Sequence, residues 1–173
     1  MTSIIKVDQI QDSAGTVLMD NEPVVDIWRL TADFGTNNAA ITGWERPDDG
    51  YNASINGLTE SSGVFTFTKT GLYQVTCHFR AQNVSASDST FSVVIQVSTD
   101  SGSNYDNAAI NSCGETTTGT NNGASCTAHV NVTDVSTFRV QFLTSSVSAG
   151  TVISGDTDTN YTSVSFIKLA PAQ

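Results

Sequence analysis

Hydrophobic and polar residues alternate with a period of two in several stretches of the chain. The clearest stretch is 71–81, GLYQVTCHFRA, and the alternation recurs in 91–98, 127–132 and 138–142. Side chains of a β-strand point alternately to its two faces, so this pattern predicts strands that bury one face. In the clearest stretch the buried side carries Tyr73, Val75, Cys77, Phe79 and Ala81.

Short apolar runs between turn signals indicate further strands. They lie at 24–31, 40–44 and 64–68, and the nearly continuous run 164–169 is typical of a strand covered on both sides. About a third of the residues are Ser, Thr or Asn, which favour strands and turns over helices. We therefore predict an all-β protein, an antiparallel β-sandwich of about eight strands, which is the number in a jelly roll.

The first twenty residues form a separate pattern. Residues 4–19, IIKVDQIQDSAGTVLM, contain two short apolar strands around the turn 12–15, which predicts a β-hairpin or β-arm. Pro23 then interrupts the pattern, so we place a boundary near residue 22 and predict an attachment arm in 1–22 and a jelly-roll domain in 23–173. The apolar side chains of this arm are those of Ile4, Ile5, Val7, Ile10, Val17 and Leu18.

Charge and composition exclude several partners. The formal net charge is −10 with only seven Lys and Arg residues, so we expect no binding to nucleic acid or to anionic membranes. No apolar run is long enough for a membrane-spanning helix, and the opening residues lack the apolar core of a signal peptide. We expect a protein made in the cytoplasm, whose three cysteines are free thiols.

The chain offers little catalytic or metal-binding chemistry. It has no nucleophile elbow, phosphate loop or HExxH motif, so we expect no enzyme and no cofactor, although two carboxylates could still meet in space as in a glycosidase. Cys77-His78 and the pair Cys126 and His129 resemble zinc spacings. Alternation along a strand separates the members of each pair, so we expect no metal site there, although His78 and His129 could still share one outer face.

Two further interpretations stay open at the sequence level. Cys77 and Cys126 both point inward, so they would be adjacent if their strands are neighbours. Residues 156–160, DTDTN, alternate oxygen-bearing side chains, which fits an ordinary acidic turn or a weak calcium site in a surface loop.

Aromatic residues in polar segments are candidates for an exposed binding surface. Trp44 precedes a polar loop that contains Tyr51, and Tyr105 lies within the long polar stretch 98–125, which could be a functional excursion or a simple crossover. Trp28 lies in an apolar run and is expected in the core or in an interface. We therefore name Trp44, Tyr51 and Tyr105 as the candidate binding residues.

Three segments resemble the complement globular-head domain, a member of the tumour-necrosis-factor-like jelly rolls. These segments are 65–73, FTFTKTGLY, then 134–143, DVSTFRVQFL, and 161–169, YTSVSFIKL. The resemblance spans about residues 24–170. It implies a homotrimer in which one sheet packs around a three-fold axis and the loops present a binding surface.

The opening residues IIKVDQIQDSAGT are similar to the start of marine bacteriophage tail-fibre and related virion proteins. This resemblance implies a structural protein of the virion, assembled in the host cytoplasm, whose partners are its own copies, other tail or capsid proteins and a host surface glycan. The favoured role is a receptor-binding knob for host attachment. The alternative is a capsid decoration protein, since the chain has no shaft of repeats, and a secreted lectin-like domain comes third.

Overall fold

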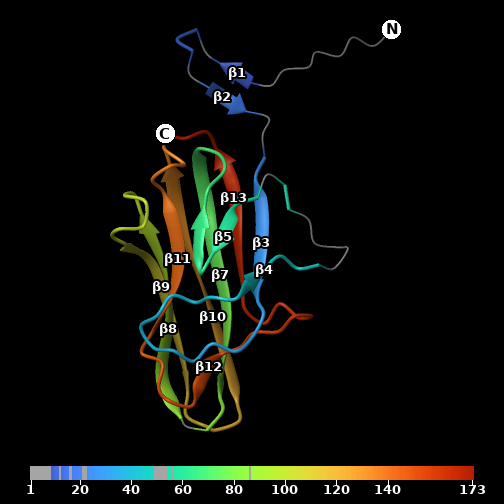
Figure 1. Ribbon diagram of the computed structural model, residues 1–173, viewed down its shortest axis with the longest axis vertical. Coiled ribbons are helices and arrows are strands. Elements are labelled where there is room, and N and C mark those ends of the chain that lie inside the picture. Colours follow the sequence, from blue (N-terminus) through green and yellow to red (C-terminus); the bar gives the residue numbers. More distant parts are fainter. Residues whose placement is uncertain are drawn as a thin grey trace.

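Two antiparallel β-sheets lie face to face in the body of the protein (Figure 1). The computed structural model describes residues 9–11, 13–15, 17–20, 23–48, 54–55, 57–85 and 87–173. The first sheet has the order β10 (Asn121–Val132), β7 (Gly71–Asn83), β13 (Ser163–Ala170), β3 (Val25–Leu30) and β4 (Trp44–Glu45), with β12 (Thr151–Ile153) paired to β7. The second has the order β5 (Thr59–Ser61), β6 (Val64–Thr66), β11 (Arg139–Ser145), β8 (Asp88–Ser98) and β9 (Asp106–Glu115). This architecture confirms the predicted all-β sandwich.

The core is a cluster of aromatic rings between the two sheets. Phe65 is fully buried at its centre, with its ring 5.5 Å from that of Trp28 and 5.0 Å from that of Phe166. Trp44 and Phe142 complete the cluster, 6.0 Å and 5.6 Å from Phe65. Most of these contacts are edge-to-face or tilted, the arrangement that aromatic quadrupoles favour. The period-two pattern of the sequence thus becomes one apolar layer.

Most of the predicted strands are found, but the strand predicted at 40–44 is wrong, because only Trp44 and Glu45 form a strand there and Ala40 makes an isolated bridge to Leu143. Residues 98–125 are neither a long excursion nor a crossover, because they contain the whole of β9 and the start of β10. The run 164–169 is not covered on both sides, since Ile167 is 36% exposed and Leu169 is 51% exposed. The pattern also missed the three-residue strands β5 and β12, which are too short to show a period.

The edge strands β9 and β10 come from different sheets, yet two side chains link them. The amide nitrogen of Asn111 donates to the carbonyl of Ser125 at 2.7 Å, and that of Asn122 donates to the carbonyl of Gly114 at 2.8 Å. Backbone acceptors of an open edge would otherwise attract a strand from another molecule. These amides therefore close one side of the sandwich.

A short hairpin precedes the body. Strand β1 (Gln9–Gln11) pairs antiparallel with β2 (Val17–Asp20), and Gly15 in the connecting turn has a φ of 82°. The hairpin is a two-stranded sheet of its own and lies beyond one end of the sandwich (Figure 1). Among the predicted arm residues, Ile10, Val17 and Leu18 lie in its strands, whereas Ile4, Ile5 and Val7 lie outside the described residues.

Candidate functional site

The outward side of β10, β7 and β13 presents a regular grid of side chains, which we call the hydroxyl face. The strand register aligns three rows across it. The rows are Ser125, His78 and Ser163, then Thr127, Thr76 and Ser165, and then His129, Gln74 and Ile167. These are the polar positions of the alternating sequence pattern, so the strands place them together away from the core.

The hydroxyl face carries no carboxylate. None of the residues of β7, β10 and β13 is Asp or Glu, although the chain has 17 such residues and a net charge of −10. The charged or titratable side chains that point outward from these strands are His78, His129 and Arg80. This is therefore a broad surface on which the general negative charge of the protein is missing.

One end of the hydroxyl face is apolar. Ile167 and Leu169 are exposed there, and Leu72, Val25 and Ile27 are half-buried on the neighbouring strands. Apolar side chains that line up on one surface are a common mark of a protein interface. The apolar run in the sequence indicated a second covering layer, but in the part of the chain that the structure describes nothing covers Ile167 and Leu169 fully.

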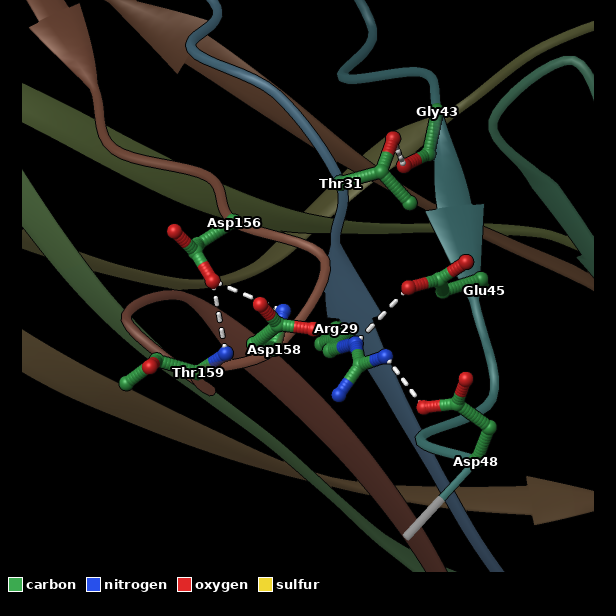
Figure 2. A network of polar contacts seen from close by, with 8 residues as sticks. All are labelled: Arg29, Thr31, Gly43, Glu45, Asp48, Asp156, Asp158 and Thr159. Carbon is green, nitrogen blue, oxygen red and sulfur yellow. Dashed lines mark hydrogen bonds and ion pairs between the residues drawn. The ribbon is translucent and has the colours of Figure 1, made fainter.

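Arg29 lies on β3, the strand next to β13, at the border of the hydroxyl face. It points outward from β3, yet it is fully buried, because two loops cover it (Figure 2). Its Nε donates to Glu45 Oε1 at 2.8 Å and its Nη2 donates to Asp48 Oδ1 at 2.6 Å. The hydrogen bond from Arg29 lowers the pKa of Asp48, and the bond to Glu45 raises the pKa of Arg29. This network holds the segment that carries Glu45 and Asp48 against the sheet.

A second buried charge lies on the inner side of the same strand. Asp26 is fully buried and accepts hydrogen bonds from Arg46 Nε at 2.9 Å, from Trp28 Nε1 at 3.0 Å and from the backbone N–H of Leu58 at 2.7 Å. The guanidinium of Arg46 also stacks over the Trp28 ring, 4.2 Å from its centroid. These hydrogen bonds satisfy the carboxylate, so Asp26 joins Arg46, Trp28 and Leu58 on the inner side of the sheet.

In the acidic loop 156–160, one carboxylate is hydrogen-bonded to the backbone of its own turn. The backbone N–H groups of Asp158 and Thr159 both donate to Asp156 Oδ1 at 2.7 Å, and these bonds lower the pKa of Asp156. Figure 2 shows the loop beside Arg29. Within the described ranges, no three His, Cys, Asp or Glu side chains come together as a metal site, and the register places His78 and His129 in different rows.

The three candidate aromatic residues differ in where the structure places them. Trp44 is buried, 6% exposed, and its Nε1 donates to the carbonyl of Ile41 at 2.8 Å, so the prediction that it is exposed is wrong. Its ring fills the core beside Phe142. The polar loop that follows Trp44 in the sequence gave no sign of this burial. Tyr105 is half-buried, and burial raises the pKa of its hydroxyl. Tyr51 lies outside the described residues.

Sequence reasoning missed one exposed aromatic ring. Tyr161 is 40% exposed, and the guanidinium of Arg80 lies over its ring, 4.1 Å from the centroid. The two residues are far apart in the sequence, and their positions gave no motif. They mark the end of the hydroxyl face opposite to Ile167 and Leu169, because Arg80 lies beyond the row of His78.

Comparison with known proteins supports the fold. No family model matches the chain, and no curated protein is similar to it in sequence. Among solved structures, the Eiger TNF of S. frugiperda is similar over 88% of this chain and 96% of that one, with a TM-score of 0.65 and 14% identity. Murine APRIL is similar over 85% of this chain and 99% of that one, with a TM-score of 0.54 and 12% identity. The chain therefore has a tumour-necrosis-factor-like jelly-roll fold.

No helix in the described part of the chain is long and apolar enough to cross a membrane.

Proposed function

We propose that the protein is a non-enzymatic structural component of a bacteriophage particle, which assembles as a homotrimer through its hydroxyl face and serves as a receptor-binding knob. The observation that carries this proposal is the absence of carboxylates from that face. Copies with a net charge of −10 repel one another, and the repulsion is weakest where they meet without acidic side chains. Closed cyclic symmetry lets such a face be buried without open-ended growth.

The composition of the face supports contact between copies. Apart from the bond of 3.0 Å between the hydroxyls of Thr76 and Thr127, the described side chains of its three rows make no hydrogen bonds with one another. Their donors and acceptors are available to a neighbouring copy. Ile167 and Leu169 add apolar area that a neighbour would remove from water.

The place in a virion is supported by the first residues. The segment 4–16 is similar to the opening of phage fibre proteins, and the β1–β2 hairpin pairs with neither sheet of the body. A hairpin outside the sandwich can dock on another virion protein without disturbing the core. The loops of the body would then face outward, towards a host glycan.

Assembly is tested by measuring the molar mass of the purified protein with light scattering. We expect the wild type to be a trimer and Ile167→Asp to be a monomer, because the substitution places a carboxylate in the interface. Ile110→Asp is the matched control, since Ile110 is 58% exposed on the outward side of the other sheet. A monomeric wild type, or a variant Ile167→Asp that stays trimeric, contradicts the proposed assembly.

Location is tested by counting copies in purified particles. A few trimers at the tail support the receptor-binding role, whereas many copies across the head would show the alternative, a capsid decoration protein. Deletion of residues 1–20 should leave a folded trimer that no longer enters particles. Absence of the protein from particles contradicts both roles, and unfolding of the shortened chain contradicts the boundary at residue 22.

A further inference from the structure

Two thiols lie directly opposite each other inside the first sheet. Cys126 of β10 is paired in register with Cys77 of β7, and both side chains point into the core, where they are 7% and 0% exposed. Residues opposed in an antiparallel ladder have Cα atoms roughly 4.5 or 5.5 Å apart. A disulfide spans Cα separations of roughly 4.4–6.8 Å, so the register brings the two residues within the range of a cross-link.

The two thiols influence each other. Hydrogen bonding with Cys126 and burial raise the pKa of Cys77, and hydrogen bonding with Cys77 lowers the pKa of Cys126. Cys126 Sγ also lies 3.8 Å from the carbonyl oxygen of Val93, to which it donates. Cys126 is thus both the more accessible and the more acidic thiol of the pair.

We infer that Cys77 and Cys126 are a latent disulfide, which closes when the folded protein meets a peroxide. The Cys126 thiolate attacks one oxygen of hydrogen peroxide, the O–O bond breaks, and the products are a sulfenic acid and hydroxide. Cys77 then attacks the Cys126 sulfur, the S–O bond breaks, and the leaving hydroxide takes the thiol proton to form water. In total two thiols are oxidised to one disulfide, and one peroxide is reduced to two waters.

The cross-link would tie the edge strand β10 to β7 across a long stretch of chain. Closing such a loop disfavours the unfolded state. The bond lies beneath the hydroxyl face, because Thr127 and Thr76 are the next opposed pair and point outward. This inference concerns one chain and holds whether or not the protein forms trimers, so its failure is distinguishable from failure of the proposed function.

The test treats the reduced, full-length protein with hydrogen peroxide and then alkylates it after unfolding. The reduced protein should take up three alkyl groups and the oxidised protein one, on Cys113, with a Cys77–Cys126 peptide pair in the digest. Dithiothreitol should reverse the change, and the oxidised form should melt about 5–15 °C higher. Three alkyl groups after oxidation, a link that contains Cys113, or sulfinic acid at Cys126 without a link would overturn the inference.

Cys113 supplies the matched control. It is half-buried on β9, opposite Phe91, and burial raises its pKa to about 11, so it reacts slowly. Cys113→Ser should still form the link, whereas Cys77→Ala should not and should instead leave Cys126 as sulfenic or sulfinic acid. If Cys77→Ala does not fold, the peptide map of the wild type decides alone.

Discussion

The outward surfaces of the two sheets are both polar, yet their polar groups behave differently. On the second sheet the groups bond to one another across strands. Gln141 Nε2 donates to Gln96 Oε1 at 2.7 Å, Gln96 Nε2 donates to Asn107 Oδ1 at 2.8 Å, and the hydroxyls of Ser92 and Ser112 are 2.7 Å apart. On the hydroxyl face the described rows contain one such bond, between Thr76 and Thr127.

Acidic residues are also distributed differently between the two surfaces. Strands of the second sheet carry Asp88, Asp106, Glu115 and Glu60, whereas the three strands of the hydroxyl face carry no carboxylate. A surface whose polar groups satisfy one another and whose strands are acidic is suited to water. A surface with unused donors and without like charges is suited to another copy of the chain. The exposed fractions of the side chains alone would not distinguish these two surfaces.

The largest effect on stability is expected on the inner side of β3, the neighbour of β13 in the first sheet. Asp26→Ala removes a buried carboxylate and leaves Arg46 and the Trp28 indole N–H without their acceptor. We expect a loss of about 3–5 kcal/mol in the free energy of unfolding, measured with urea. The control Asp106→Ala, at an exposed position of β9, should change it by less than about 0.5 kcal/mol. Equal losses of unfolding free energy in the two variants would show that the hydrogen bonds of Asp26 do not stabilise the fold.

A pair of glutamines tests the two surfaces directly. Gln96→Ala removes two side-chain hydrogen bonds from the second sheet, and we expect it to lower the free energy of unfolding by about 1 kcal/mol. Gln74→Ala removes none of the described bonds, so monomer stability should stay the same while the proposed trimer should dissociate more readily. The opposite result, with Gln74→Ala destabilising the monomer, would remove the distinction between the surfaces.

The smallest effect on stability is expected in the turn between β8 and β9. Hydrogen bonds from Asn104 and Ser98 lower the pKa of Asp100 from 3.8 to about 2. A carboxyl with a depressed pKa stabilises the fold above the unfolded value and loses this contribution as pH falls through the folded value. The stability difference between the wild type and Asp100→Asn should therefore be largest above about pH 4 and shrink towards about pH 2. A difference that does not vary with pH contradicts this account.

Much of the fold could be predicted because the alternation is local. Strand β7 and the inward side chains of β8 and β11 follow from a period of two, since the backbone geometry of a strand imposes that period. Strand β9 was missed because it lies at an edge and is largely exposed, so few of its positions are apolar. Trp44 was misplaced because its burial depends on Phe65 and Phe142, which are distant in the sequence.

The sequence by itself determined that the chain is all-β, that Cys77 and Cys126 point inward, and that carboxylates avoid three of its strands. Only the tertiary structure decided that those three strands are neighbours, that the two thiols face each other in register, and that Arg29 is covered by loops. The reason is physical. The direction of a side chain is set by the local backbone, whereas its neighbours are set by the pairing of strands that the whole core selects.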